Sequence, residues 1–149
     1  DGKYAKVNGI ECTIKCLFSD KKSAGKKKPY YYYRFDADIP GWDNAGTFHS
    51  VDLWFFFETL AKCWRPFVGR HYDLSRMMCN YWVNFIKTGD PNGNDADGKP
   101  MPYWYPYEKE KPCEMIFMSD RPVVNCGGVT PFKEFLQEQI KKTLSIGKI

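Results

Sequence analysis

The chain has 149 residues, of which 43% are hydrophobic and 27% are charged, a balance typical of one folded domain with a moderate core. No window approaches the roughly 18 uncharged apolar residues of a membrane span, so we expect none. The chain begins at Asp1 without a basic and then apolar leader. No signal peptide is therefore visible in it, and the compartment is left open.

The formal net charge is +4, and the basic excess gathers in one segment. Residues 1–28 hold eight Lys against three acidic residues, whereas the remaining 14 basic and 15 acidic groups nearly cancel. A nucleic-acid-binding protein usually spreads basic residues along a face, with aromatic residues between them. We therefore predict that residues 1–28 form a basic helix and a solvated loop, without a nucleic-acid partner.

The first predicted elements are a helix and an aromatic strand. A helix is expected over residues 9–21, where four apolar residues share one stripe: Ile10, Ile14, Leu17 and Phe18. Pro29 then introduces residues 30–36, an aromatic run without the alternation of a half-exposed strand. Such a run favours a strand covered on both faces, as in a parallel sheet flanked by helices. Residues 38–46 follow as a loop, because they contain Pro40, Gly41 and Gly46.

Two helices are predicted in the middle of the chain. Residues 51–62 form the first, with Ser50 as its cap and Asp52 in its first turn. This helix is apolar nearly all round, so it must be buried on more than one side. Residues 72–88 form the second, with apolar residues at i, i+3, i+4 and i+7. Gly89 ends it, and residues 90–93 form a turn.

The last part of the chain is expected to hold one short strand and one helix. The strand covers residues 113–118, residues 122–126 form an irregular return, and a helix begins with Thr130 as cap and Pro131 at its first position. Its predicted buried face consists of Phe132, Phe135, Leu136, Ile140 and Leu144. The sequence pattern predicts no neighbouring strand with which the aromatic strand at residues 30–36 could pair. We therefore expect residues 1–149 to be the carboxyl-terminal part of a larger α/β domain, incomplete alone.

The cysteines indicate neither a metal site nor a disulfide framework. The six cysteines include no C-x-x-C pair, and the chain has only two histidines, so no zinc site can be built. Buried free thiols are the preferred interpretation. A disulfide scaffold requires a secreted protein. The six are Cys12, Cys16, Cys63, Cys79, Cys113 and Cys126.

His49 is the best candidate for a catalytic side chain. It lies in a loop that follows the predicted buried strand and precedes a helix. In open α/β sheets, functional groups gather at the carboxyl ends of the strands, where this loop begins. Imidazole titrates near neutral pH, so it can take and return a proton. The alternative is that His49 only packs or caps beside Ser50.

Three segments then resemble one family. They are Tyr32–Asp36 (YYRFD) with Gly46-x-x-His49-Ser50-x-Asp52-Leu53, residues 81–93 (YWVNFIKTGDPNG), and Pro102-x-Trp104-x-Pro106-Tyr107. Together, in this order, they resemble the histidine region of the type-B carboxylesterases, which are cholinesterase-like α/β-hydrolases. The resemblance runs from about residue 29 to residue 118.

This resemblance implies the carboxyl-terminal part of an α/β-hydrolase fold, with a late sheet strand, a histidine loop and flanking helices. It implies a serine hydrolase of small carboxylic esters, with His49 as the triad histidine and no cofactor or metal. No serine of this chain lies in G-x-S-x-G. The nucleophile and the acid are therefore expected in the missing amino-terminal part of the same fold, and this chain alone is expected to be inactive.

Other residues receive more modest interpretations. His71 is expected to be a surface or capping residue, and the cluster Trp54–Phe57 to pack in the core rather than line the ester pocket. Asp52 is expected to help fix the loop that presents His49. Asp90 and Asn92 favour a turn over a calcium site, and we assign no catalytic role to Asp36, Asp38, Asp43, Asp95 or Asp97.

Two other functions are compatible with parts of the pattern. One is a non-catalytic relative that serves in adhesion, against which a histidine at the matching position argues. The other is an aromatic-rich module that binds carbohydrate through residues such as Trp104. That module would have to fold on its own, which the unpaired strand at residues 30–36 disfavours.

Overall fold

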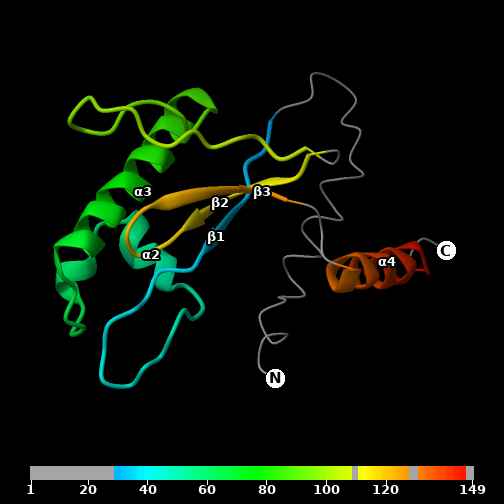
Figure 1. The fold of residues 1–149 in the computed structure, drawn as a ribbon, viewed down its shortest axis with the longest axis horizontal. Helices are drawn as coiled ribbons and strands as arrows, with labels where there is room; N and C mark the ends of the chain where they lie inside the picture. Colours follow the sequence, from blue (N-terminus) through cyan, green and yellow to red (C-terminus); the bar gives the residue numbers. More distant parts are fainter. Residues whose placement is uncertain (1–28, 109–110, 128–130, 147–149) are drawn as a thin grey trace. The chain divides into compact units, whose positions relative to one another are not determined.

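The computed structural model describes residues 29–108, 111–127 and 131–146 (Figure 1). It divides into two units, of which the larger comprises residues 29–107 and 113–126. The predicted helix over residues 9–21 and the basic segment 1–28 lie outside the described residues. The larger unit holds a small mixed sheet and the helices that cover it.

The sheet has three strands in the order β1-β2-β3. β1 (Tyr33–Phe35) pairs in parallel with β2 (Cys113–Phe117), and β2 pairs antiparallel with β3 (Pro122–Cys126). Every residue of β2 is buried, which is typical of a central strand with both faces covered. The parallel pair requires a crossover connection, and the helices between β1 and β2 supply it.

This sheet corrects three expectations. β1 is only three residues long and half-buried, so it is shorter and less covered than the run at residues 30–36 predicted. Its neighbour β2 lies within the chain, so the prediction that β1 has no partner here is wrong. Residues 122–126 form a strand rather than an irregular return. The argument against an autonomously folding module therefore loses its main support.

The first predicted helix is shorter than expected and is followed by a separate turn of helix. α2 (Val51–Phe56) ends before Glu58, whose φ of 51° places it in the left-handed region, and the 3-10 helix η2 (Leu60–Lys62) follows. Ser50 precedes α2 with φ 66°, and its side chain makes no capping hydrogen bond. The position of the helix start is confirmed, but the capping role of the Ser50 hydroxyl is wrong.

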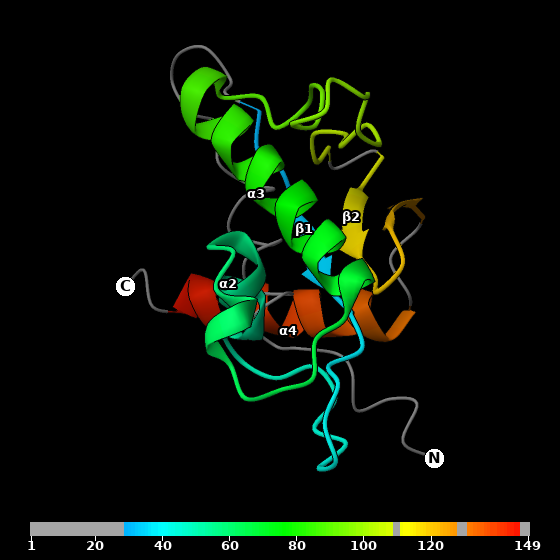
Figure 2. The same ribbon diagram turned by 90° about the vertical axis from the view of Figure 1, so that its left-hand side faces the viewer.

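α3 (Gly69–Thr88) confirms the second predicted helix and begins three residues earlier. Gly89 ends it with φ 80°, and the Gly89 N–H donates to the Phe85 carbonyl at 2.8 Å. The left-handed conformation at this position favours glycine. α2 and α3 pack together on one face of the sheet (Figure 2). Their buried side chains meet those of β2 in one core, which includes Phe55, Phe56, Leu74, Met78, Tyr81, Met115 and Phe117.

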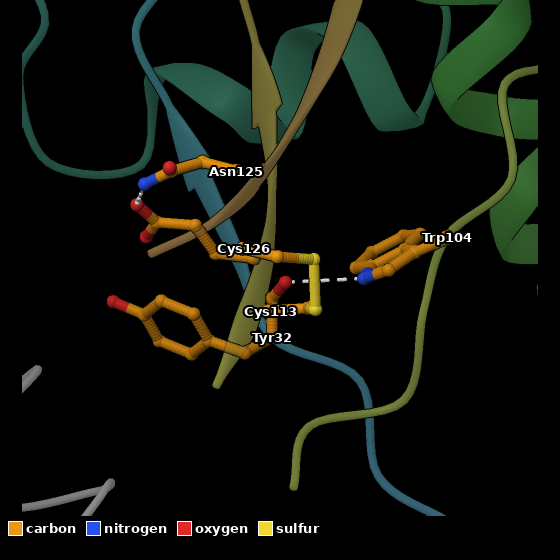
Figure 3. Close-up of a disulfide and its surroundings, with 6 residues drawn as sticks. Tyr32, Trp104, Cys113, Asn125 and Cys126 are labelled. Carbon is orange, nitrogen blue, oxygen red and sulfur yellow. Dashed lines mark hydrogen bonds between the residues drawn. A yellow bond between two sulfur atoms is a disulfide. The ribbon is translucent and has the colours of Figure 1, made fainter. Parts of the chain in front are cut away.

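Trp104 joins the loop after α3 to this core. Its indole N–H donates to the Tyr32 carbonyl at 3.1 Å (Figure 3). Its ring meets the rings of Tyr33, Tyr81 and Phe117 edge-on, with centroids 5.6–6.0 Å apart. Such edge-to-face contacts add to the stabilisation from apolar burial. Because Trp104 is buried in the core, it does not offer an exposed ring for carbohydrate.

Cys113 and Cys126 form a disulfide between β2 and β3, shown in Figure 3. They are directly opposed in the antiparallel ladder, with Cα atoms 4.1 Å apart. The preference for free thiols is therefore wrong for this pair, because the pairing depends on a strand that the sequence pattern did not predict. Cys63 and Cys79 are free, and Cys12 and Cys16 lie outside the described residues.

The described part of the second unit holds α4 (Pro131–Ile146). Pro131 occupies its first position, as predicted, whereas Thr130 lies outside the described residues. The predicted buried face is wrong at Phe135, which is 54% exposed. Leu136 and Ile140 are half-buried, and the side chains of Phe132 and Leu144 lie outside the described part. None of the helices described here is both long and apolar enough to cross a membrane.

Candidate active site

The loop of residues 36–50, here called the histidine loop, connects β1 to α2 and carries His49. It begins at the carboxyl edge of the sheet, where the Asp36 N–H donates to the Phe117 carbonyl at 2.9 Å. The Asp38 N–H donates to Ser119 Oγ at 2.6 Å, and Thr47 Oγ donates to the Ala37 carbonyl at 3.4 Å. The loop therefore leaves and returns at the carboxyl ends of β1 and β2, the edge at which α/β proteins place functional groups.

His49 lies at the end of this loop, two residues before α2, and its side chain is exposed. Within the part of the chain that the structure describes, its imidazole makes no hydrogen bond or ion pair. The next residue, Ser50, has φ 66°, a conformation that costs free energy in a residue other than glycine. An exposed imidazole between a folded loop and the start of a helix is accessible to a ligand or to side chains of other segments, with which it can exchange protons.

Asp52 anchors the start of α2 to the sheet. Its Oδ2 accepts a hydrogen bond from the Tyr33 hydroxyl at 2.7 Å. Burial and the Asp52 carboxylate raise the pKa of the Tyr33 phenol well above its usual range, so the phenol remains a donor. Because Asp52 lies in the first turn of α2, this bond fixes the helix that follows His49. This hydrogen bond links Asp52 to Tyr33 of β1, as we expect for a residue that helps to fix the loop presenting His49.

Arg65, which follows η2, holds the other side of the histidine loop, and no sequence motif marks it. Its guanidinium donates to both carboxylate oxygens of Asp43, at 2.9 and 2.7 Å, and to the Pro40 carbonyl at 3.1 Å. The guanidinium carbon, Arg65 Cζ, lies 5.4 Å from the centroid of the Phe48 ring and 4.6 Å from that of the Trp64 ring. The Arg65 side chain is only 6% exposed.

The ion pair has a defined electrostatic effect. The hydrogen bonds from Arg65 lower the pKa of the Asp43 carboxyl, and Asp43 in turn raises the pKa of Arg65. Both groups therefore stay charged across the physiological pH range. No sequence signal reveals this pair, because its members come from separate elements and neither belongs to the quoted family motifs.

The aromatic cluster Trp54–Phe57 divides between core and surface. Phe55 and Phe56 are fully buried, and Trp54 is half-buried against the rings of Phe48 and Phe67. Phe57 is exposed. Core packing is therefore confirmed for Phe55 and Phe56, while it is wrong for Phe57.

His71 corrects another expectation. It lies inside the first turn of α3 and is buried, so it is not a surface residue. Its Nδ1 accepts a hydrogen bond from the Val68 N–H at 2.9 Å, which is a capping interaction. The capping half of the prediction is therefore confirmed. Its Nε2 is buried and has no hydrogen-bond partner among the residues that the structure describes.

The acidic residues of the loops behave as turn and ion-pair residues. Asp90 accepts hydrogen bonds from the main chain and the side chain of Asn92, which confirms the turn. Asp95 accepts from two main-chain N–H groups of its own loop, and Asp36 pairs with Arg34 at 3.2 Å. Among the described ranges of the chain, no three His, Cys, Asp or Glu side chains gather as a metal ion would require.

The family model of the carboxylesterases matches residues 10–127. The chain belongs to the carboxylesterase family. It is 32% identical over 98 residues to acetylcholinesterase 1 of Caenorhabditis elegans, a match that covers 64% of this chain and 16% of that protein. It is 35% identical over 92 residues to carboxylesterase 4A of Bos taurus, covering 56% of this chain and 15% of that protein. The resemblance noted in the sequence motifs is thereby confirmed.

Solved esterases show the same fold. An esterase from Clostridium hathewayi matches 76% of this chain and 21% of its own, with 24% identity and a TM-score of 0.58. The carboxylesterase EST55 of Geobacillus stearothermophilus matches 74% of this chain and 21% of its own, with 28% identity and a TM-score of 0.51. The mixed sheet and its helices are therefore part of an α/β-hydrolase fold. This chain of the carboxylesterase family spans only about a sixth of the curated relatives named above.

Proposed function

We propose that this carboxylesterase chain belongs to a serine hydrolase of carboxylic esters and that His49 is its catalytic base. The observation that carries the proposal is the position of His49: an exposed imidazole on a loop that begins and returns at the carboxyl edge of the sheet, in a fold shared with esterases. The nucleophilic serine and the acid are supplied by another segment of the same protein, since no serine of this chain lies in G-x-S-x-G.

In this proposal His49 takes the proton of the serine hydroxyl as the oxygen attacks the ester carbonyl. The imidazolium then gives that proton to the leaving alcohol, which yields an acyl-enzyme. In the second half, His49 takes a proton from water, the resulting hydroxide oxygen attacks the acyl carbon, and the serine recovers its proton. Each step needs the imidazole exposed on the side from which the serine approaches, which the histidine loop permits.

The substrate class is a carboxylic ester, and two kinds of relative support it. The curated relatives include a carboxylesterase, acetylcholinesterases and a bile salt-activated lipase. The solved esterase from Clostridium hathewayi is described as hydrolysing aliphatic aromatic polyesters. We leave the particular ester unassigned.

The test uses the full-length protein that contains this chain, labelled with a fluorophosphonate probe and analysed by intact mass. We expect one serine adduct on a protein several times larger than 17.4 kDa. His49→Ala should lower kcat/KM for p-nitrophenyl acetate by about a thousandfold or more. Lys62→Ala, an exposed substitution on η2, serves as the matched control and should change it less than twofold.

Two results would contradict the proposal. A His49→Ala enzyme that kept most of its activity would exclude His49 as the base. A full-length protein without a reactive serine would favour the non-catalytic, adhesion-type relative. Residues 1–149 alone should neither label nor hydrolyse the ester, and added imidazole should partly restore the full-length His49→Ala enzyme.

A further inference from the structure

A buried arginine holds both halves of the histidine loop. We propose that Arg65 is a positioning residue, which keeps His49 where proton transfer requires it. The inference rests on the proposed role of His49. We call the Arg65 side chain with its four contacts the Arg65 clamp; these contacts are Pro40, Asp43, Phe48 and Trp64.

The clamp spans the loop from its first half to the residue before His49. Pro40 and Asp43 belong to the first half, and the Phe48 ring that lies against the guanidinium belongs to the second. Phe48 directly precedes His49, and its carbonyl accepts the Val51 N–H at 3.3 Å as α2 begins. A displacement of Phe48 therefore moves the backbone that carries the imidazole.

His49 depends on this backbone for its position. Among the described residues, no hydrogen bond or ion pair holds its imidazole. After His49, Ser50 and α2 fix the main chain, because the Asp52 carboxylate accepts a hydrogen bond from the Tyr33 hydroxyl at 2.7 Å. Before His49, Phe48 lies against Arg65. An error of about 1 Å in the placement of a catalytic group can lower its rate by about a hundredfold.

The chemistry of the clamp requires arginine. Its planar fork meets both oxygens of Asp43 while its flat face lies against aromatic rings, and lysine can do only part of this. Gly41 also makes room for the clamp. A Cβ atom at Gly41 would lie 2.5 Å from Arg65 Nη1 and 2.6 Å from Asp43 Oδ1, so any larger residue would push the ion pair apart.

The test compares substitutions in the full-length protein. Arg65→Met removes the cation, Arg65→Lys keeps the charge, and Gly41→Ala leaves both charged residues but crowds them. The matched controls are Arg76→Met, an exposed arginine 3.7 Å from Asp73, and Gly69→Ala, where an added Cβ meets nothing within 4 Å. All five variants are first checked for cooperative thermal unfolding.

We expect Arg65→Met and Gly41→Ala to lower kcat about 10- to 100-fold with KM changed less than threefold. The kcat of Arg65→Lys should lie between the values of these two variants and that of the wild type. The rate of fluorophosphonate labelling should fall in parallel, because it uses the same base. The kcat and the labelling rate of both control variants should stay within twofold of the wild-type values. An Arg65→Met enzyme that folds and keeps the wild-type kcat would overturn the inference.

A second readout does not depend on activity. Amide hydrogen exchange over residues 38–50 should be faster in Arg65→Met and Gly41→Ala than in Arg76→Met and Gly69→Ala. Unchanged exchange in this loop would overturn the clamp even if activity fell. Retained activity in His49→Ala would instead contradict the proposed function, while the exchange data would still decide whether Arg65 holds the loop.

Discussion

His71 is a titratable side chain enclosed at the start of α3, with 1% of its surface exposed. Its ring lies edge-on to that of Phe67, with centroids 5.4 Å apart, and its Nδ1 accepts the Val68 N–H. Burial lowers the pKa of His71, and the charge of Arg70 adds to this effect, while Asp38 opposes it in part. The folded protein therefore favours the neutral ring.

This environment predicts a loss of stability in acid. A histidine with a lowered pKa binds its proton more weakly in the folded state than in the unfolded state. The free energy of unfolding should therefore be highest above the unfolded pKa of about 6.5 and decrease as the pH falls below it, by at most about 1.4 kcal/mol per pH unit. Urea unfolding at a series of pH values between about 7.5 and 5 measures this.

His71→Asn provides the comparison for this prediction. Asn Oδ1 can accept the Val68 N–H in place of Nδ1, but the residue does not titrate in this range. The difference in unfolding free energy between wild type and variant should shrink as the pH falls. Parallel pH dependences for the two proteins would show that His71 does not contribute.

At the scale of single residues, the sequence led to His49 but not to Arg65 or to the burial of His71. His49 lies within a motif and beside a loop–helix boundary, both of which are local. Arg65 meets Asp43, 22 residues earlier in the chain, and this contact exists only once η2 returns the chain beside the histidine loop. A pattern of neighbouring residues contains no information of this kind.

Among the elements, one side chain links the turn after α3 directly to Trp104. Asn92 donates to Asp90 Oδ1 at 2.8 Å and to the Trp104 carbonyl at 2.9 Å, and its Oδ1 accepts the Trp104 N–H at 2.6 Å. These bonds place Trp104 where its indole N–H reaches the Tyr32 carbonyl, immediately before β1. Asn92 thus couples a surface turn to the aromatic core.

Asn92→Ala should therefore destabilise the protein by about 2–3 kcal/mol, because it removes three hydrogen bonds and leaves main-chain groups of a buried residue unpaired. Asn94→Ala is the matched control, since its side chain is exposed in the same loop; we expect a change within about 0.5 kcal/mol. Chemical denaturation followed by tryptophan fluorescence measures both. Equal stabilities for the two variants would contradict the coupling role of Asn92.

The elements also show which parts of a fold a sequence can reveal. α3 was predicted because its apolar periodicity and Gly89 are local signals. The pairing of β1 with β2 joins segments far apart in the chain, and β2 was seen only as an isolated strand. The sequence pattern did not predict β3, and it therefore did not reveal the Cys113–Cys126 disulfide. The two cysteines meet only through the register of β2 with β3.

At the scale of the whole molecule, one face of α3 presents apolar side chains to solvent. Trp82, Val83, Phe85 and Ile86 are all exposed, and Ile86 has 71% of its surface exposed. Apolar surface of this kind marks a face that packs against other protein. Since the chain spans only a small share of its carboxylesterase relatives, these residues are candidates for contacts made within a longer protein.

We therefore expect residues 1–149, produced alone, to self-associate at concentrations on the order of tens of micromolar. Ile86→Lys should weaken this association, because a charged group on the apolar face cannot be buried without a partner. Asn94→Lys adds the same charge to an exposed loop and controls for repulsion between positively charged molecules. Sedimentation velocity across a concentration series distinguishes the three proteins. A monomeric wild-type chain, or equal effects of the two lysines, would show that the exposed face of α3 does not drive association.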